Sequence, residues 1–258
     1  MSFEFNAEQY EKASNHQQEW GRTLIDELSL KGDERVLDLG CGDGRLTAMI
    51  ADRVPDGAVL GIDSSHSMIE RARLREAENL SFAVNDICDI RGLGYFDLLF
   101  SNAALHWITD HRSLWRDIDN ILNPGGTIRF SFAAKGNSGN FLDAVGEIMD
   151  HSDFSSLFDD FAWPWYNPSI DEYREIIGSF EFSRMTVWTE NRDRYFPDRD
   201  SLVGWIDQPC IVPFLAHLNE KTGPLFRDRV VDLTERKTEC PDGRYFETFE
   251  RINIYAVK

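Results

Sequence analysis

The chain lacks long apolar runs, paired cysteines and basic tracts, and each absence excludes a class of protein. Its apolar runs are far shorter than the roughly 20 residues that a membrane-spanning helix needs, so no membrane partner is expected. Its 4 cysteines form no C-x-x-C pair, which predicts reduced thiols with no metal site and no disulfide framework. These residues are Cys41, Cys88, Cys210 and Cys240. Together with a polar, acidic segment at 1–5 that is unlike a secretory signal, these features predict a cytoplasmic protein.

Basic residues are few relative to acidic ones. With 27 lysines and arginines against 45 aspartates and glutamates, the formal net charge is −18. Because binding to nucleic acid usually requires a basic face, we expect no nucleic-acid partner. The same charge would repel a polyanionic small molecule unless a local basic pocket overrides it. The candidates for such a pocket are Arg192, Arg194 and Arg199.

The glycine-rich segment 36–44, VLDLGCGDG, is the most informative part of the chain. A short apolar strand runs into Gly40, Gly42 and Gly44, and a helical pattern follows. Glycines let the backbone turn sharply and let a ligand lie against main-chain N–H groups. A dinucleotide fingerprint would require a glycine in place of Arg45, and the lysine of a P-loop is missing. The loop therefore predicts a ligand with an adenosine but no pyrophosphate, at the carboxyl end of a first parallel strand.

Three later segments follow the loop in an informative order. Asp63 ends a second strand about 20 residues after the loop, where an acid can accept hydrogen bonds from both ribose hydroxyls. Asp86 follows a third strand, and a fourth leads into the segment 96–107, FDLLFSNAALHW. In this order the loop and the three segments resemble the class I methyltransferases that use S-adenosylmethionine, and the resemblance covers most of the chain.

The resemblance implies roles for individual residues. Asp86 would meet the adenine amino group, the backbone N–H of Ile87 would meet a ring nitrogen, and 96–107 would form the floor of the methyl-transfer site. The residues expected to hold S-adenosylmethionine from the loop onward are Asp38, Gly40, Cys41, Gly42, Asp63, Ser64, Met68, Asn85, Asp86, Ile87, Ser101 and Asn102.

Upstream of the first strand, Tyr10, Ser14, Gln17 and Gln18 resemble a pattern that small-molecule methyltransferases fold over the methionyl end of the cofactor. Tyr10 and Gln17 are two helical turns apart, so both can face one way. A tyrosine ring near the sulfonium would stabilise its charge by about 1 kcal/mol. The alternative is an ordinary amphipathic helix with solvated glutamines.

The alternation of apolar strands and helical patterns predicts an α/β fold with a doubly wound, mostly parallel sheet. Helices are expected at 6–29, 44–53, 65–77, 111–122 and 224–237, and strands at 34–39, 58–63, 80–84, 95–101 and 126–132. The turn at 123–126, NPGG, is expected to precede the fifth strand. The resemblance adds a strand near 181–191 and a last, antiparallel strand near 245–257, which gives a Rossmann-like sheet of seven strands.

Two stretches lie outside this minimal core and are expected to form an inserted cap over the carboxyl ends of the strands. The predicted division is 1–135 for the N-terminal helices and the S-adenosylmethionine-binding core, 136–180 for the cap insertion, 181–196 for a core strand, 197–240 for a second cap segment and 241–258 for the final core strand. A cap in this place would select the acceptor and exclude water.

The cap and the segment after the fourth strand supply the candidates for the acceptor pocket. These are His106, Trp107, Trp163, Trp165, Tyr166 and Trp205. For each aromatic residue the alternative is that it packs the cap onto the core. His106 is the candidate catalytic residue, because a hydroxyl acceptor would need a base, whereas a carboxylate is already ionised. The alternative for His106 is a structural role as a hydrogen-bonded residue at the start of a helix. The second histidine of this segment, His111, is expected to be exposed on a helix.

Two families of carboxyl methyltransferases share features with the chain. The segment 101–111, SNAALHWITDH, closely resembles the matching stretch of trans-aconitate methyltransferases, which esterify a small tricarboxylate. The segment 10–18, YEKASNHQQ, and Trp205 with the following Gln208-Pro209 look as much like juvenile hormone acid methyltransferases, which esterify a long apolar acid. The aromatic cap, the acidic balance and the lack of a tight arginine cluster favour an apolar or singly charged acid, whereas the shared segment after the fourth strand favours a trans-aconitate-like acid.

The sequence therefore predicts an S-adenosylmethionine-dependent methyltransferase acting on a small-molecule acceptor, at a carboxylate oxygen. The alternatives are a nucleotide-binding oxidoreductase and a non-catalytic S-adenosylmethionine-binding protein. A monomer or homodimer is expected.

Overall fold

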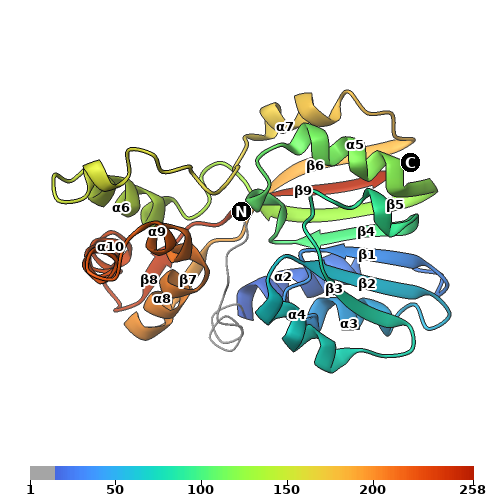
Figure 1. Ribbon diagram of the computed structural model, residues 1–258, viewed down its shortest axis with the longest axis horizontal. Coiled ribbons are helices and arrows are strands. Elements are labelled where there is room, and N and C mark those ends of the chain that lie inside the picture. The colour runs from blue at the N-terminus through green and yellow to red at the C-terminus, as the bar shows by residue number, and fades with distance from the viewer. Residues whose placement is uncertain (1–14) are drawn as a thin grey trace.

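The computed structural model describes residues 15–258, and a seven-stranded sheet forms its centre (Figure 1). The strand order is β3-β2-β1-β4-β5-β9-β6. The strands are β1 (Arg35–Leu39), β2 (Ala58–Asp63), β3 (Leu80–Val84), β4 (Phe96–Asn102), β5 (Leu122–Ala133), β6 (Arg184–Asn191) and β9 (Glu250–Val257). Strands β1 to β5 pair in parallel, and β9 runs antiparallel between β5 and β6. This topology confirms the predicted Rossmann-like, doubly wound fold with an antiparallel last strand.

Helices cover both faces of the sheet, which explains why its central strands are almost continuously apolar. The helices on the sheet are α2 (Asn15–Asp26), α3 (Arg45–Ala51), α4 (His66–Ala72), α5 (His111–Ile121) and α7 (Ile170–Ile177). Val36 of β1 packs in the cluster under α2, α3 and α4, whereas Leu37 packs in the cluster under α5 and α7. Both side chains are fully buried, as expected for a parallel strand that is covered on both sides.

The boundaries of two elements differ from those predicted. Strand β5 begins at Leu122, which pairs with Phe96, before the register shifts and Thr127 pairs with Leu98. The segment 123–126 therefore forms an irregularity inside the strand and not a turn before it. The helix expected at 65–77 ends at Ala72 and continues as a short 3-10 turn. The 3-10 turns of the chain are η1 (Arg73–Arg75), η2 (Arg91–Leu93), η3 (Leu105–Trp107) and η4 (Ser155–Leu157).

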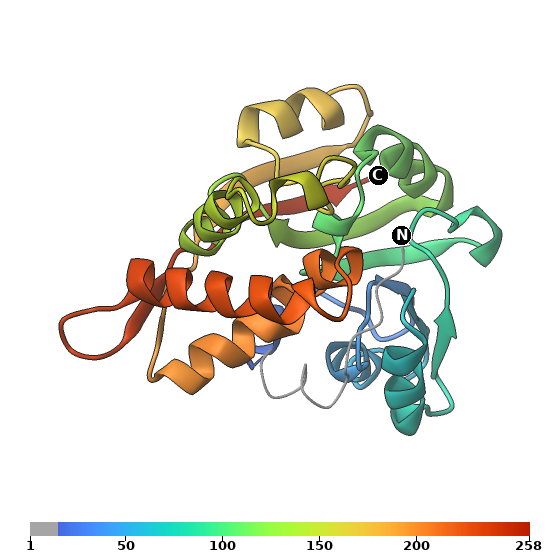
Figure 2. The same ribbon diagram turned by 60° about the vertical axis from the view of Figure 1, so that its left-hand side comes forward.

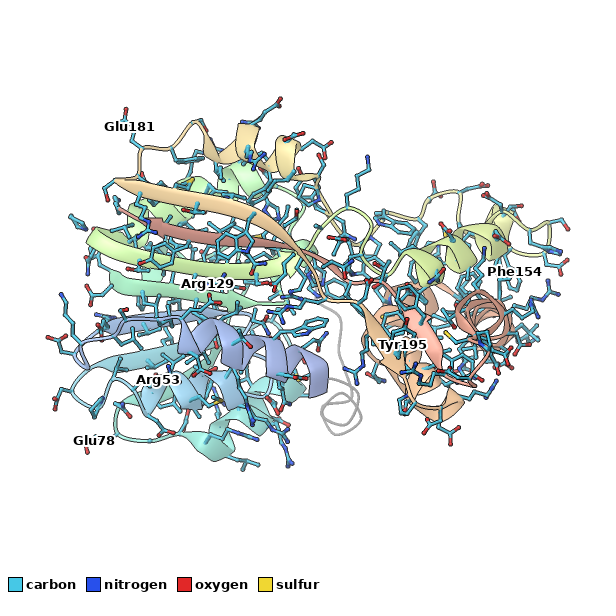
Figure 3. All side chains as sticks on the ribbon, turned by 180° about the vertical axis from the view of Figure 1, so that it is seen from behind. Arg53, Glu78, Arg129, Phe154, Glu181 and Tyr195 are labelled. Atoms are coloured by element: carbon cyan, nitrogen blue, oxygen red, sulfur yellow. The ribbon has the colours of Figure 1, made fainter. Side chains whose placement is uncertain are left out.

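A cap lies beyond the carboxyl ends of the parallel strands, on the left of Figure 1 and turned forward in Figure 2. Its elements are α6 (Gly139–Met149), β7 (Arg194–Phe196), α8 (Arg199–Trp205), the π-helical turn η5 (Ile206–Cys210), α9 (Val212–His217), α10 (Thr222–Thr238) and β8 (Tyr245–Glu247). The cap has its own apolar cluster, in which Phe141, Trp205 and Phe226 are buried. Figure 3 shows the same division from behind, with Phe154 and Tyr195 in the cap.

The structure divides the chain differently from the sequence analysis in two places. Helix α7 was expected in the cap insertion, but it packs on the main sheet beside α5, because Tyr173, Ile176 and Ile177 form an apolar face that the sheet buries. Strands β7 and β8, expected within core segments, pair only with each other in the cap. Among the described residues, no helix is both long and apolar enough to cross a membrane.

Candidate functional site

The glycine loop between β1 and α3 is held tightly against its neighbours. Gly40 and Gly42 have positive φ angles of 76° and 55°, which glycine adopts without strain. The N–H groups of Gly40 and Cys41 both donate to the carbonyl of Ile62, each at 2.9 Å. A Cβ atom on Gly40 would lie 2.2 Å from the Cβ of Ala104, whereas one on Gly42 would meet nothing within 4 Å. The loop therefore packs tightly against Ala104, the residue before η3, at Gly40 and faces open space at Gly42.

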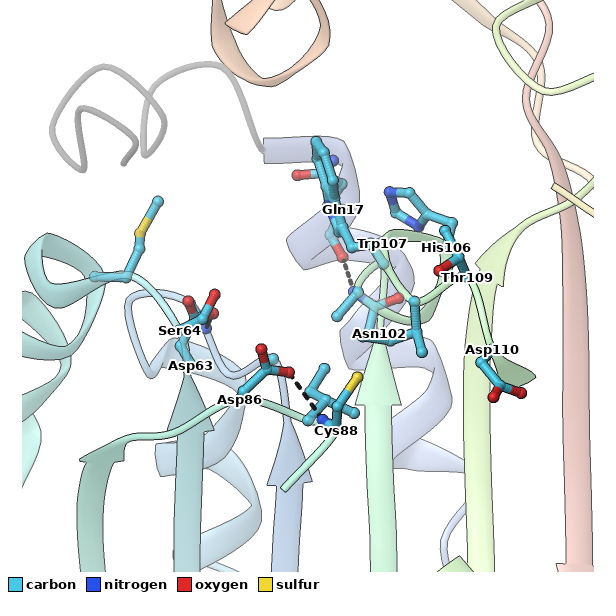
Figure 4. Close-up of a pocket in the computed structure, with 17 residues that line it drawn as sticks. Gln17, Asp63, Ser64, Asp86, Cys88, Asn102, His106, Trp107, Thr109 and Asp110 are labelled. Atoms are coloured by element: carbon cyan, nitrogen blue, oxygen red, sulfur yellow. Dashed lines mark hydrogen bonds between the residues drawn. The ribbon is translucent and has the colours of Figure 1, made fainter. Parts of the chain in front are cut away.

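That open space is a cavity of about 270 Å³ at the carboxyl ends of β1, β2 and β4, which we call the main cavity (Figure 4). Its lining residues are Gln17, Gly40, Gly42, Asp63, Ser64, Met68, Asp86, Ile87, Cys88, Asn102, Ala103, Ala104, His106, Trp107, Ile108, Thr109 and Asp110. Asp63 accepts hydrogen bonds from the backbone N–H groups of Gly42 at 3.0 Å and Ser65 at 2.9 Å. These two bonds fix the orientation of the carboxylate at the cavity wall.

The corner after β3 combines an acid with exposed backbone. Asp86, Ile87 and Cys88 all line the main cavity, and Asp86 accepts from the N–H of Cys88 at 2.8 Å. Asn85, which the sequence analysis placed at the cofactor, does not line the cavity. Its amide instead donates to the carbonyls of Asp86 and Asp89, at 2.9 and 2.8 Å. Asn85 therefore shapes the corner, because a short amide side chain readily bonds the backbone of its own turn.

A smaller cavity of about 60 Å³ lies behind the glycine loop, against α2. Asp38 and Cys41 line it, as does Gln18, whose carbonyl oxygen accepts from Arg45 at 3.1 Å. Burial raises the pKa of Cys41 well above its usual value, so its thiol stays protonated and is a packing group. Asp38 is buried and accepts from the hydroxyl of Thr47 at 2.6 Å. Burial raises the pKa of Asp38 to about 7, although the Thr47 hydrogen bond opposes this and nearby Asp63 adds to it.

The raised pKa of Asp38 predicts how stability depends on pH. A carboxyl group whose pKa is higher in the folded state contributes stability below its unfolded pKa near 4, and this is lost as pH rises toward 7. The full effect is on the order of 4 kcal/mol. Chemical denaturation of wild type and Asp38→Asn at pH 5 and pH 8 measures it. We expect the variant, which cannot ionise, to lose less stability between these two values than wild type. Equal losses would contradict a raised pKa at Asp38.

A third cavity of about 70 Å³ lies between the sheet and the cap, and we call it the inner chamber. It shares Gln17, Ala103, His106 and Trp107 with the main cavity, so these four residues form the junction between the two. Its other lining residues are Trp20, Ala133, Asn137, Ser138, Phe141, Leu142, Trp165, Asn167, Trp205, Cys210, Phe249 and Arg251. Ala103 adopts a left-handed φ of 59°, an unfavourable conformation for alanine, where β4 turns sharply into η3.

Arg251 of β9 is the charged group of the inner chamber. Its side chain is buried, with 4% of the residue surface exposed, and its guanidinium carbon lies 4.8 Å from the ring centre of Trp20. Its Nε donates to the hydroxyl of Ser131, and its Nη2 donates to the side-chain carbonyl of Asn102, both at 2.9 Å. Burial lowers the pKa of Arg251 to about 9. The charge of Glu190 raises this pKa, whereas the charges of Arg192 and Arg129 lower it further. The group therefore remains charged at neutral pH.

Comparison with known proteins shows what kind of protein contains these cavities. Residues 36–126, from β1 into β5, match the family model described as a methyltransferase domain. The trans-aconitate 2-methyltransferase of Deinococcus radiodurans is 29% identical over 98% of both chains. That of Escherichia coli is 27% identical over 90% of both chains. The chain is an S-adenosylmethionine-dependent methyltransferase.

Solved structures resemble the methyltransferase in fold. The YcgJ protein of Bacillus subtilis has a TM-score of 0.61 and 16% identity, over 93% of this chain and 98% of its own. Phosphoethanolamine N-methyltransferase 2 of Haemonchus contortus, in complex with S-adenosyl-L-methionine, also has a TM-score of 0.61, with 20% identity over 98% of this chain and 56% of its own. Identities this low show the fold alone. The methyltransferase domain overturns the oxidoreductase alternative.

The residues of the main cavity fit S-adenosylmethionine, the cofactor of this methyltransferase. Gly42 leaves open a space that a side chain would fill, so a ligand can approach its backbone closely. Asp63 presents a carboxylate of fixed orientation at the end of β2, and Asp86 presents a second one beyond β3. Within residues 15–258, no group of three or more histidine, cysteine or acidic side chains is arranged to hold a metal ion.

The structure brings most of the predicted cofactor residues of the methyltransferase together. The main cavity or the small cavity is lined by Asp38, Gly40, Cys41, Gly42, Asp63, Ser64, Met68, Asp86, Ile87, Asn102, Gln17 and Gln18. Ser101 lines neither, because its buried hydroxyl donates to the carbonyl of Leu39 at 2.8 Å and so ties β4 to β1. Tyr10 and Ser14 lie outside the described residues.

The predicted acceptor residues of the methyltransferase divide into two groups. His106, Trp107, Trp165 and Trp205 line the inner chamber. Trp163 and Tyr166 do not line it. Trp163 is 43% exposed and packs against neighbouring aromatic rings. Tyr166 supports the site through its backbone N–H, which donates to the carbonyl of His106 at 2.8 Å.

His106 and His111 differ from the sequence-based expectations. Burial lowers the pKa of His106 to about 3, and Arg251 and His111 lower it further, so the ring is neutral at physiological pH. His111 is only 2% exposed, and the prediction that it is exposed is wrong. Its ring turns inward to bond the carbonyl of Leu105 and the hydroxyl of Tyr173, each at 3.0 Å. His111 thereby supports η3, which carries His106.

The main cation of the site was not predicted from the sequence. The proposed basic residues Arg192 and Arg199 pair with Glu190 at 2.7 Å and Glu235 at 2.9 Å, and neither lines a cavity. Arg251 occupies the chamber instead. The available signal was an arginine at the start of the mostly apolar segment 251–257, RINIYAV, where a charge in a central strand needs a specific partner.

Proposed function

We propose that this methyltransferase transfers the methyl group of S-adenosylmethionine to a carboxylate oxygen of a small acid. The observation that carries the proposal is the inner chamber, which adjoins the main cavity and contains the buried cation Arg251. A buried guanidinium favours an anionic ligand, and a carboxylate matches its planar fork of donors. The names of the relatives support this choice, because trans-aconitate is a carboxylic acid.

The main cavity and the small cavity would hold the cofactor. Asp63 is proposed to accept from the ribose hydroxyls, and Asp86 with the backbone of Ile87 to bind the adenine. Gly40 and Gly42 would lie under the ligand, and Asp38 would face its methionyl end across the small cavity. The remaining proposed contacts are Cys41, Ser64, Met68, Gln17, Gln18 and Asn102.

When bound, the cofactor supplies a methyl group on a positively charged sulfur. The residues of the junction then have to hold the acceptor oxygen in line with that methyl group and exclude water. A carboxylate with a pKa near 4 is already ionised at neutral pH, so no general base is required. This agrees with His106, whose low pKa makes it a poor proton acceptor. We propose that neutral His106 orients the acceptor by hydrogen bonding and that Trp107 and Trp165 exclude water.

The proposal predicts which class of acceptor is methylated. We expect formation of S-adenosylhomocysteine with small carboxylic acids and not with phenols, amines or long fatty acids of matched concentration. The product should be a methyl ester, which mild alkali hydrolyses. A donor-consumption screen with product identification by mass spectrometry measures both. An alkali-stable product on nitrogen or a phenolic oxygen would contradict carboxylate methylation.

Two controls separate catalysis from simple binding. S-adenosylhomocysteine should raise the melting temperature of the protein, whereas NAD should not, because Arg45 occupies the position of the third fingerprint glycine. Tight binding of S-adenosylhomocysteine without turnover of any acid would favour the non-catalytic alternative.

We also propose that the enzyme is cytoplasmic and that it acts on its small-molecule acceptor as a monomer or a homodimer.

A further inference from the structure

The inner chamber contains a buried cation, Arg251, with an unused donor group and no ion-pair partner among the described residues. Nε and Nη2 of Arg251 make hydrogen bonds to Ser131 and Asn102, but Nη1 makes none within residues 15–258. No acidic side chain among these residues lies within ion-pair distance of Arg251. Glu190 is its register partner on β6, but one carboxylate oxygen of Glu190 pairs with Arg192 at 2.7 Å and the other accepts from Asn253 at 3.3 Å.

Other polar groups around this chamber also lack partners. The ring nitrogen Nδ1 of His106, the indole nitrogen of Trp165 and the side-chain oxygen of Asn167 are buried and make no hydrogen bond among the described residues. All three residues line the inner chamber. A buried polar atom without a partner destabilises a protein, because it has lost its hydrogen bonds to water. Three such atoms around one cavity, together with the free edge of Arg251, indicate a site built for a polar ligand.

Arg251 does not lie at the place of methyl transfer. The junction, where an acceptor atom can meet the cofactor, consists of Gln17, Ala103, His106 and Trp107. Arg251 lines the inner chamber but not the main cavity. A ligand that reaches both the junction and Arg251 therefore places one end at the methyl group and another end on the guanidinium.

Electrostatics argues that the group on Arg251 is not the one that reacts. A carboxylate loses its negative charge as it becomes an ester, so an ion pair to the reacting carboxylate would be stronger in the ground state than in the transition state. Such an interaction slows the reaction, because only interactions that strengthen in the transition state accelerate it. A carboxylate that does not react keeps its charge throughout, so its ion pair anchors the substrate without this penalty.

We propose that Arg251 binds a second, unreacting carboxylate of the acceptor and so determines specificity for short acids with two or more carboxylates. This inference rests on the proposed function and deepens it. The reacting carboxylate lies at the junction among neutral groups, and the distal carboxylate accepts from Nη1 of Arg251. The small volume of the chamber, about 70 Å³, limits the chain between the two carboxylates to a few atoms. With a dicarboxylate, methylation stops at the monoester, because the monoester has lost one of the two required charges.

Matched acids test this assignment in the full-length protein with saturating S-adenosylmethionine. The panel contains straight-chain dicarboxylates of four to six carbons and the monoamide of each, in which a neutral amide replaces the distal carboxylate. We expect wild type to prefer each dicarboxylate that it methylates over the corresponding monoamide by at least about 100-fold in kcat/KM. In Arg251→Gln we expect this ratio to fall below about 5-fold. Arg251→Lys, which keeps the charge but not the fork, should give an intermediate ratio.

Arg129→Gln is the matched control. Arg129 is a buried arginine on the adjacent strand β5, it pairs with Glu27 at 2.8 Å, and it lines neither the main cavity nor the inner chamber. Its variant should keep the wild-type ratio. The wild-type comparison needs no variant, so the test holds even if Arg251→Gln does not fold.

Equal rates with dicarboxylate and monoamide in wild type, or an unchanged ratio in Arg251→Gln, would overturn the role of Arg251 and leave carboxylate methylation intact. Methylation of amines or phenols with no acid turned over would instead overturn the proposed function. Product analysis adds an independent readout. Diester at more than about one per cent of monoester would contradict the requirement for a second carboxylate.

Discussion

Gly40→Ala is expected to lower the melting temperature of the unliganded protein by roughly 5–15 °C. The left-handed φ of 76° is unfavourable for alanine by about 1–2 kcal/mol. The added Cβ would also lie 2.2 Å from the Cβ of Ala104, and relieving such a clash costs about 1–3 kcal/mol. For a chain of this size, each kcal/mol corresponds to about 2–4 °C. Differential scanning calorimetry without ligand measures the shift.

Gly42→Ala is the matched control for this prediction. Its φ of 55° carries a similar backbone penalty, but a Cβ there meets nothing within 4 Å. We expect a smaller loss of about 2–6 °C. We also expect weaker binding of S-adenosylhomocysteine, because the new methyl group would project into the space proposed for the cofactor. If the two variants melted at the same temperature, the tight contact between the loop and Ala104 would be disproved.

Asp63→Ala is expected to weaken binding of S-adenosylhomocysteine by roughly 30- to 1,000-fold. The carboxylate of Asp63 is held by the N–H groups of Gly42 and Ser65, so it is already oriented when a ligand arrives. Removing it would delete two charge-assisted hydrogen bonds to the ribose, which together stabilise the complex by about 2–4 kcal/mol. Isothermal titration calorimetry at constant ionic strength gives the ratio of dissociation constants.

Asp97→Ala provides a comparison for the loss of a structural carboxylate. Asp97 lies near the amino end of β4, where it accepts from the N–H of Arg35 at 2.9 Å and the amide of Asn123 at 2.8 Å. It is far from the carboxyl ends of the strands and lines no part of the main cavity. We expect its variant to melt earlier and to bind S-adenosylhomocysteine with wild-type affinity. Unchanged affinity in Asp63→Ala would refute the ribose role of that residue.

The sheet was predictable from the sequence because each of its strands has a local signature. The parallel strands are short apolar runs, and those that carry the cofactor loop and the first acid end in glycine or aspartate at the edge where parallel strands meet. Gly40, Asp63 and Asp86 could therefore be assigned to one cavity before any coordinates were known. The β5 irregularity at 123–126 could not, because a proline and two glycines indicate a turn equally well before a strand and inside one.

The acceptor side was less predictable, because its residues come together only through tertiary packing. Arg251 and Trp20 meet across β9 and α2, which are far apart in the chain. His111 has the sequence context of an exposed helix start, and only the positions of Leu105 and Tyr173 turn its ring inward. Ser101 and Asn85 follow strands as cofactor residues do, but their short side chains bond nearby backbone instead.

The walls of the main cavity and of the inner chamber come from different parts of the polypeptide. Apart from Gln17, the main cavity is lined entirely by residues between Gly40 and Asp110, whereas most of the inner chamber comes from Ala133 and beyond. Recombination or mutation in the later half of the chain could therefore change the acceptor specificity of a descendant enzyme. The earlier half would keep the binding site for the methyl donor. Arg251 would change least readily, because its strand β9 is hydrogen-bonded to β5 on one side and to β6 on the other. Irregular stretches of the chamber wall, such as 165–167, would diverge first.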